Sequence, residues 1–211
     1  MNAVLKKIKT PVLVAFAVLF LCGLGYPLLL TGISQAIFPD RANGSLVEIN
    51  GRAVGSKLVG QDFTDARFMK CRPSAVSYNT YTQEDKRNGS YVGVASGSQN
   101  LGTGNPALLK RVEADIAEFL KENPAVRKED IPADLFTASG SGLEPYISPA
   151  SAAMQIPALV EATGLPEEFL EGIVKEHTQG KLLGVFGEKT VNVLLVNLDI
   201  ARKLGLGGSP E

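Results

Sequence analysis

Apolar residues are distributed unevenly along the chain, with one long uninterrupted run near its start. The range 10–39 contains no charged residue and lies between the basic stretch 6–9 and the pair Asp40 and Arg41. A helix rises about 1.5 Å per residue, so about 20 residues cross a hydrocarbon layer of about 30 Å. A charge at its centre would cost about 2.5–3.5 kcal/mol. The pattern predicts a single transmembrane helix over residues 10–39.

A cleaved signal peptide is the alternative interpretation of this run. Its apolar part would be about 7–15 residues long and would end at a small-residue cleavage site. Here the run continues to Phe38, and no Ala-x-Ala pattern follows closely. A lipoprotein site at Cys22 is disfavoured by the bulky Phe20 and Leu21 before it. We therefore expect a permanent anchor.

The flanking charges predict how the helix is oriented. Three lysines, Lys6, Lys7 and Lys9, precede the run, whereas only Arg41 and Arg52 follow it closely. Basic residues concentrate on the cytoplasmic side of a membrane span. We expect residues 1–9 in the cytoplasm and residues 40–211 outside it, as one domain of ordinary size.

Small residues in the predicted span fall close to one helical face. Gly25, Gly32 and Ala36 are seven and four residues apart, a spacing that lets another helix approach closely. Glycine is also common in membrane helices that make no such contact. Pro27 is expected to kink the helix or weaken one of its backbone hydrogen bonds.

The rest of the chain mixes strand and helix signals, so we expect an α+β fold: one N-terminal transmembrane helix followed by one mixed helix and strand domain outside the cytoplasm. Asn50-Gly51 is a favoured two-residue turn and predicts a hairpin. Asn105 and Pro106 are typical of the first positions of a helix. Expected elements are hairpin strands 46–49 and 52–54, helices 106–123, 149–164 (interrupted or kinked at Pro157), 166–175 and 193–204, a strand 182–186, and loops 60–104 and 134–145.

Composition excludes several kinds of site. The net charge is −1, so no basic footprint for nucleic acid is present. Cys22 lies in the apolar run and Cys71 outside it, so we expect no disulfide within the chain. Cys71 is expected to be a buried small hydrophobe. The single histidine, His177, has no cysteine or histidine cluster near it, so we expect no zinc site and a structural or solvated role.

Motifs for phosphate binding and hydrolysis are absent. The sequence contains neither GxxxxGK[ST] nor GxSxG, and no carboxylate pair stands out as an acid and base. Two Gly/Ser-rich segments, 96–102 and 137–142, could present backbone N–H groups to an anion, although such loops are more often plain turns. Arg72, beside Pro73, could bind a carboxylate or a partner, with a structural salt bridge as the equal alternative.

Several long segments resemble a known family. They are YPLLLTGISQAIFPDRANGSL, GSKLVGQDF, RPSA, SGSQNLGTGNPAL, DLFTASGSGLEPYISPASA and GVFGEKTVNVLLVNL. Over essentially its whole length the chain resembles the C subunit of the bacterial potassium-transporting ATPase, the KdpC family. Two departures are Tyr146, where the family tends to have histidine after the proline, and Gln99, inserted before the asparagine of a GSNLG-like pattern. We therefore expect no metal or proton role at position 146.

The resemblance implies an accessory role in an ATP-driven potassium uptake complex of the bacterial inner membrane. Its partners would be a channel-like subunit that carries the potassium path and a P-type ATPase subunit, with room for a small single-span subunit and contact with membrane lipid. The C subunit is described as a catalytic chaperone that raises the ATP affinity of the ATPase subunit. ATP and K⁺ would be used by the complex, and no cofactor is expected on this chain.

Other features of the sequence agree with a non-catalytic subunit. One helix cannot enclose a pore, and the chain has no DKTG-type phosphorylation site. The lysine bias places the domain where ATP is absent, so any effect on ATP affinity would be indirect, as a coupling of about 1–3 kcal/mol. The alternatives are an anchored exoplasmic hydrolase using Ser139 or Ser141, and a tethered binding module with no transport partner.

The residues expected to contact partners form two sets, and none is expected to be catalytic or to bind metal. The helix-packing set would pack on the channel-like subunit, and the outer domain would sit near its ion entrance. The helix-packing set is Gly25, Gly32 and Ala36; the family-motif set is Arg72, Pro73, Ser74, Gln99, Asn100, Gly102, Asn105, Pro106, Ser139, Gly140, Ser141 and Gly142.

Overall fold

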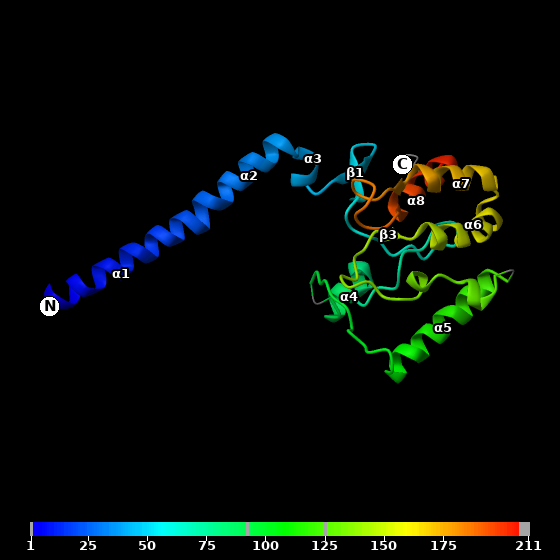
Figure 1. The fold of residues 1–211 in the computed structure, drawn as a ribbon, viewed down its shortest axis with the longest axis horizontal. Coiled ribbons are helices and arrows are strands. Elements are labelled where there is room, and N and C mark those ends of the chain that lie inside the picture. Colours follow the sequence, from blue (N-terminus) through cyan, green and yellow to red (C-terminus); the bar gives the residue numbers. More distant parts are fainter. Residues whose placement is uncertain (1, 92, 125, 207–211) are drawn as a thin grey trace. The chain divides into compact units, whose positions relative to one another are not determined.

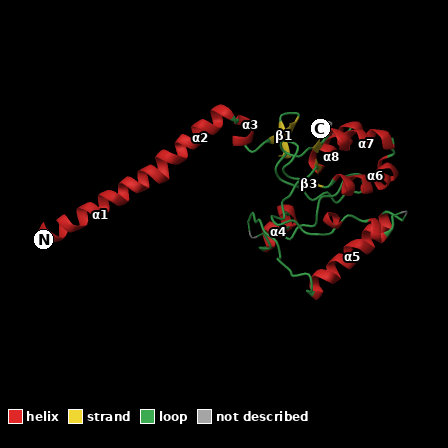
Figure 2. Cartoon of the chain, in the orientation of Figure 1, coloured by secondary structure: helices red, strands yellow, loops and turns green. Residues whose placement is uncertain are grey.

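The computed structural model describes residues 2–91, 93–124 and 126–206, with helices, short strands and long loops (Figures 1 and 2). The chain divides into two compact units, Met1–Leu46 and Val47–Glu211. Each unit is described by itself below. The mixture of helices and short strands confirms the α+β class.

The first unit is almost entirely helical. It contains α1 (Asn2–Phe20), a π-helical turn (Leu21–Gly25), α2 (Tyr26–Ile37) and the short α3 (Pro39–Ala42). Among the described residues, one helix is long and apolar enough to cross a membrane, Lys7–Ile37, with a mean hydropathy of 2.4. No residue of its most apolar window is buried within the chain, which is the pattern expected of a helix that needs an external apolar environment.

The π-helical turn lies directly before Pro27. The N–H group of Tyr26 donates to the carbonyl of Leu21, five residues back, while the backbone angles of Gly25 and Tyr26 stay helical. Pro27 has no N–H group to donate to the preceding turn, and the widened π-helical turn lies where that backbone hydrogen bond is missing. The expected loosening of the helix backbone is thus confirmed as a widened turn.

The second unit contains a hairpin, a small sheet and five helices of at least six residues among its described residues. The hairpin turns at Asn50 and Gly51, whose φ angles of 53° and 74° are those of the predicted tight turn. The elements are β1 (Leu46–Ile49), β2 (Arg52–Ser56), α4 (Gln83–Asn88), α5 (Pro106–Glu122), β3 (Tyr146–Ile147), α6 (Pro149–Thr163), α7 (Glu167–Glu176), β4 (Thr178–Gln179), β5 (Thr190–Asn192) and α8 (Val193–Lys203).

A small antiparallel sheet and three helices form the main core. The strand order is β3-β5-β4, with Ile147 and Thr178 both opposite Val191. Helices α6, α7 and α8 surround this sheet (Figure 1) and bury aliphatic side chains against it. A second, smaller cluster joins α5 to the following turns, where the rings of Phe119 and Phe136 meet edge to face at 5.6 Å.

The predicted helices are confirmed, with caps that the sequence indicated. The side chains of Asn105 and Ser148 accept hydrogen bonds from the backbone of the first turns of α5 and α6. The expected interruption at Pro157 is wrong, since α6 runs through it without a break. Pro157 lies on the exposed face, where water can satisfy the carbonyl group that it frees.

Two further predictions need correction. The range 182–186 is not a strand but a tight, exposed turn, and the strands lie on either side of it in β4 and β5. The loop range 60–104 contains α4, whose N-terminus has a capping box between Thr82 and Asp85. Its C-terminus ends at Gly89, which has a left-handed conformation.

One buried asparagine ties an irregular segment to the core. The Asn197 side chain, on α8, accepts a hydrogen bond from the N–H of Met69 at 2.8 Å and donates one to the carbonyl of Met69 at 2.9 Å. Met69 is fully buried and Asn197 is 2% exposed. From α6, the Gln155 side chain holds the N–H and C=O of Lys70 in the same way, at 2.8 and 3.2 Å.

Replacing Asn197 by alanine should lower the free energy of unfolding by about 2–4 kcal/mol, because two buried backbone groups of Met69 lose their partners. Urea unfolding of the full chain in mild detergent, with amide hydrogen exchange at residues 69–70, measures both effects. Gln83→Ala on exposed α4 is the control and should change stability by less than about 0.5 kcal/mol. Unchanged exchange at Met69 in the Asn197→Ala variant would contradict this account.

Candidate functional site

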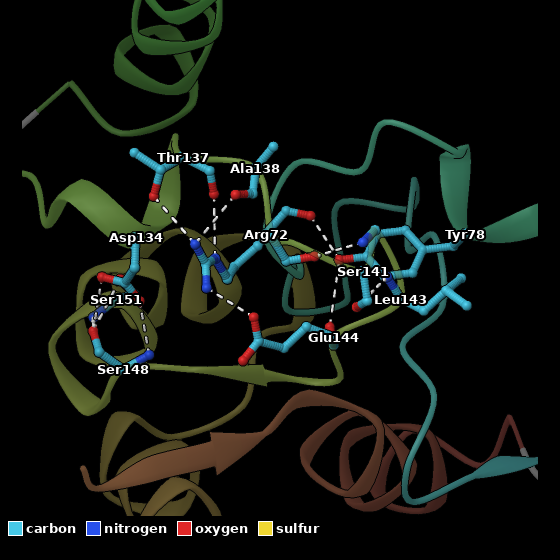
Figure 3. A network of polar contacts seen from close by, with 12 residues as sticks. Arg72, Tyr78, Asp134, Thr137, Ala138, Ser141, Leu143, Glu144, Ser148 and Ser151 are labelled. Atoms are coloured by element: carbon cyan, nitrogen blue, oxygen red, sulfur yellow. Dashed lines mark hydrogen bonds and ion pairs between the residues drawn. The ribbon is translucent and has the colours of Figure 1, made fainter. Parts of the chain in front are cut away.

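Polar segments that are far apart in the sequence converge just after Met69 and Lys70, the two residues held by Asn197 and Gln155. We call the group the loop junction; it consists of Gly60 and of residues 72–78, 96–97 and 137–144. It brings together the family-motif residues Arg72, Pro73, Ser74 and Ser139–Gly142 through hydrogen bonds among the three segments. Figure 3 shows most of this network from close by.

Arg72 is the central cation of the loop junction. Its guanidinium forms an ion pair with Glu144 at 2.7 Å and donates to the carbonyl of Thr137 at 3.2 Å (Figure 3). Weaker bonds reach the Thr137 hydroxyl and the carbonyl of Ala138. The rigid fork of arginine suits this divided recognition of carboxylate and carbonyl groups. The geometry therefore supports the structural salt bridge, one of the two readings left open for Arg72.

Ser74 holds a strained turn in place. Residues Ser77, Tyr78 and Asn79 all have positive φ angles, between 47° and 55°, a conformation that costs about 1–2 kcal/mol for each residue other than glycine. The Ser74 hydroxyl accepts from the N–H groups of Val76 and Tyr78 and donates to the carbonyl of Gly142 at 2.6 Å. The Tyr78 hydroxyl donates back to the Arg72 carbonyl at 2.7 Å.

Two glycines permit the close packing of these segments. A Cβ atom on Gly142, which has a φ of +67°, would lie 2.8 Å from Val76 Cγ2 and 2.9 Å from the Gly97 carbonyl oxygen. A Cβ atom on Gly60 would lie 2.5 Å from the Tyr78 ring. Gly60 also donates its N–H to the carbonyl of Leu143. Backbones can approach this closely only where no side chain intervenes.

Among the described residues of the segment before α5, Ser96 and Gly97 bond to the 137–144 part of the loop junction. The Gly97 N–H donates to the Ser141 carbonyl at 2.7 Å, and the Ser96 hydroxyl donates to the same oxygen. The other family-motif residues of this segment do not share in these bonds. Asn100 donates its N–H to the Ser98 hydroxyl. Asn105 caps α5 and Pro106 is its first residue. Gln99 and Gly102 lie in the loop on either side of Asn100. The N–H groups of Gly97, Asn100 and Asn105 are thus used within the chain.

Burial governs the ionisation of the groups beside Arg72. Burial raises the pKa of the Cys71 thiol to about 12; hydrogen bonds from Gln61 and Tyr78 oppose the rise, and the nearby carboxylates add to it. Burial also raises the pKa of the Tyr78 hydroxyl above its ordinary range. Both groups are therefore neutral at physiological pH. Cys71 packs against the core as a small apolar side chain, although it is partly rather than fully buried.

Asp134, which lies just before the segment 137–144, binds the N-terminal end of α6. It accepts hydrogen bonds from the N–H and hydroxyl of Ser148 and from the hydroxyl of Ser151 (Figure 3). Burial alone would raise the pKa of Asp134, but these hydrogen bonds outweigh it and hold that pKa below its usual value. The carboxylate thus stays charged while it closes the N-terminus of the helix.

A pocket of about 320 Å³ lies between the loop junction and α5. Its lining carries charges of both signs, and the ion pair of Lys70 with Glu122, at 2.7 Å, contributes to its wall. Among the described residues, no three His, Cys, Asp or Glu side chains are grouped so that they could hold a metal ion.

The geometry offers no nucleophile for hydrolysis at the two serines named above. Ser139 is 1% exposed and its hydroxyl accepts from the N–H of Gly142, while the Ser141 hydroxyl accepts from the N–H of Leu143. His177 bonds to Asp199 at 2.6 Å instead, which confirms its structural role. In the part of the chain that the structure describes, neither serine hydroxyl is bonded to a histidine or carboxylate that could act as its base.

Comparison with known proteins identifies the family. The family model described as "KdpC: K+-transporting ATPase, c chain" matches residues 8–202, which include both the apolar helix and the loop junction. The chain belongs to the KdpC family. A protein of Clostridium kluyveri named potassium-transporting ATPase KdpC subunit is 66% identical over 206 residues, covering 98% of each chain. Proteins of the same name from Clostridioides difficile and Caldanaerobacter subterraneus are 57% and 40% identical, over 96% and 94% of this chain and 100% and 96% of their own lengths.

As a KdpC family member, the chain is a membrane-associated subunit of a K⁺-transporting ATPase, which implies a complex with other Kdp subunits. The loop junction also includes residues that the sequence analysis did not single out. Gly60 and Glu144 lie inside segments quoted for the resemblance, so the signal was present. Tyr78 had none, because its role depends on a left-handed backbone and on contacts with distant residues.

Replacing Gly142 by alanine should destabilise the loop junction by about 2–4 kcal/mol, because the new methyl group meets two close neighbours and the left-handed backbone is strained. Gly140→Ala is the matched control. It lies two residues away, has no positive φ and has open space around its Cβ position. Thermal unfolding of the full chain in detergent compares the two, and equal loss of stability in both variants would refute the close-packing argument.

The Cys71 thiol should make stability depend on alkaline pH. Its folded-state pKa lies above its unfolded value of about 8.5, so its contribution is complete below that pH and is lost as pH rises toward 12. Between about pH 7 and about pH 10 the loss should reach about 1–2 kcal/mol. Urea midpoints of the wild type and of Cys71→Ala isolate this part, since Tyr78 and Cys22 are present in both. Parallel pH profiles in the two proteins would be the contrary result.

Proposed function

We propose that this chain is the accessory, non-catalytic subunit of a high-affinity, ATP-driven potassium uptake complex, in which it raises the ATP affinity of the P-type ATPase subunit as a catalytic chaperone. The observation that carries the proposal is the family match, which covers the apolar helix and the second unit together. Close relatives match the chain over nearly its full length under one name. The family is thus shared by the whole chain rather than by a single motif.

The proposed topology has residues 1–9 in the cytoplasm, residues 10–39 across the inner membrane and residues 40–211 outside the cytoplasm. The lysines before the helix support this orientation, because basic residues stay on the cytoplasmic side. The continuous helix Lys7–Ile37, none of whose apolar window is buried within the chain, supports a permanent anchor.

In this topology the second unit never meets ATP. ATP and K⁺ are bound by the partners, and the effect on ATP affinity is indirect, passing through the span into neighbouring helices. A coupling of about 1–3 kcal/mol changes an affinity by about 5- to 150-fold. The internally bonded loop junction supports this division of labour, because its polar groups are used to fix three segments rather than to bind a nucleotide.

The small-residue face of α2 is the proposed contact with the channel-like subunit, and the second unit is proposed to sit near the ion entrance of that subunit. A Cβ atom on Gly32 would have no neighbour within 4 Å, so nothing in the described chain fills the space beside it. A neighbouring helix can approach closely where Gly25, Gly32 and Ala36 share a face.

Gly32→Ile should weaken assembly, because the branched side chain prevents close approach of the partner helix. Ser34→Ile is the matched control, since Ser34 lies about 180° from the Gly25 face at about 100° per residue. Co-purification of the complex from membranes measures assembly, and the ATP concentration dependence of its ATPase activity measures the chaperone effect. We expect loss of the subunit to raise the ATP concentration required, by about 5- to 150-fold.

The two readouts separate the parts of the proposal. Intact assembly with Gly32→Ile would reject the helix contact. A complex that lacks the subunit yet keeps its ATP dependence would reject the chaperone role. Co-purification with no potassium-transporting ATPase subunit at all would reject the accessory function itself.

A further inference from the structure

The turn between β4 and β5 exposes a concentrated group of large apolar side chains. Leu182, Leu183, Val185 and Phe186 are exposed by 70%, 83%, 73% and 64%. We call these four residues the apolar tip. Single exposed apolar residues are ordinary on protein surfaces, but four within five positions form a patch that needs an explanation.

Most backbone N–H groups of the apolar tip, and the carbonyl groups at its two ends, are paired within the chain. Leu182 and Phe186 exchange both N–H to carbonyl bonds, at 2.8 and 3.0 Å. The N–H of Gly184 donates to the Lys181 carbonyl, and that of Val185 donates to the Leu182 carbonyl. These bonds lower the cost of moving the segment out of bulk water, and the remaining backbone groups can still meet water or headgroups in the interfacial region.

Leu183 is held in a conformation that leucine disfavours. Its φ is +54°, and the following Gly184 has a φ of +77°. Glycine, asparagine or aspartate occupies such turn positions at lower cost. The Leu183 side chain is the most exposed of the four, so it contributes little to packing within the chain. The backbone strain at Leu183 is not offset by packing within the chain, which indicates that the side chain serves a contact outside it.

Basic residues stand at the base of the apolar tip. Lys181 precedes it and Lys189 follows it, and Lys181 pairs loosely with Glu188 at 3.3 Å. Lysines in this position can lay their methylene stems along apolar surface while their ammonium groups remain among lipid headgroups. A protein interface would more commonly surround such a patch with polar side chains available for hydrogen bonds.

The membrane that would hold the N-terminal helix is also an apolar surface that always lies close to the second unit. Residues 38–46 link the apolar helix to the second unit, and a link of this length extends at most about 30 Å. This holds on either side of the membrane, so it does not depend on the orientation proposed above.

We propose that the apolar tip inserts into the interfacial region of the same bilayer that holds the N-terminal helix. The tip would be buried about 5–10 Å at the boundary of headgroups and acyl chains. It would provide a second attachment that limits the rotation of the second unit about its link. The inference rests on the membrane anchorage in the proposed function, but not on assembly with partners.

The chain contains no tryptophan, so a single substitution creates a unique fluorescent reporter. The test places Leu183→Trp, and separately Phe186→Trp, in the full chain reconstituted alone into vesicles of phosphatidylcholine and phosphatidylglycerol. We expect a blue-shifted emission and strong quenching by lipids brominated near the headgroup end of their acyl chains. Val94→Trp is the matched control, because Val94 is aliphatic and 80% exposed. Its emission should remain that of a water-exposed indole.

A third reporter, Phe16→Trp in α1, distinguishes the two ways in which the experiment can fail. Quenching at Phe16 without quenching at Leu183 or Phe186 would overturn the tip insertion and leave the anchorage intact. No quenching at Phe16 would overturn the anchorage on which both proposals rest. A tip reporter that becomes blue-shifted only in the assembled complex, and is not quenched by brominated lipid, would show that a partner subunit covers it instead and would also overturn the inference.

Discussion

The second unit depends on a pair of side-chain amides that hold a stretch without regular structure against the core. Asn197 and Gln155 each bond to both the N–H and the C=O of one residue, Met69 and Lys70, as a neighbouring strand would. These bonds bridge 128 and 85 positions in the sequence. Because they are buried, their free energy includes the desolvation cost that either partner would incur alone. Everything that follows Lys70, including Arg72 and the strained turn, begins from this fixed point.

The loop junction extends the same principle from the core to the surface. Its polar groups are already hydrogen-bonded within the chain. Arg72 bonds to Glu144 and to two carbonyl groups, and the Ser74 hydroxyl makes three hydrogen bonds. The Cys71 thiol stays protonated. Reactive sites leave a group activated and accessible, whereas here burial suppresses ionisation and internal hydrogen bonds occupy the donors. Such an arrangement maintains the shape of a surface. This is the property that the proposed accessory role requires.

Local signals allowed the helices and the hairpin to be predicted. The start of α5 at Asn105 and Pro106 and the Asn50-Gly51 turn both depend on neighbours within a few residues. The strands β3, β4 and β5 are two or three residues long, too short for any alternation to be visible. The loop junction could be guessed only as separate polar segments, because the hydrogen bonds between its segments join residues 44 to 83 positions apart. They also use left-handed backbone that the residue types do not reveal.

The misassigned range 182–186 shows what apolarity alone leaves undecided. A short run of leucine, valine and phenylalanine satisfies the requirements of a buried strand and those of a turn that contacts something outside the chain. Two features separate the cases, and both concern the backbone: the glycine at position 184, and the paired amides that close the turn at Leu182 and Phe186. Once the chain reverses there, the side chains cannot reach its own core. The same reasoning applies to the N-terminal helix, whose apolar surface also has no partner within the described chain. In both places large apolar side chains lie outside the core of the described chain, which is the observation behind the two proposed contacts with an apolar environment.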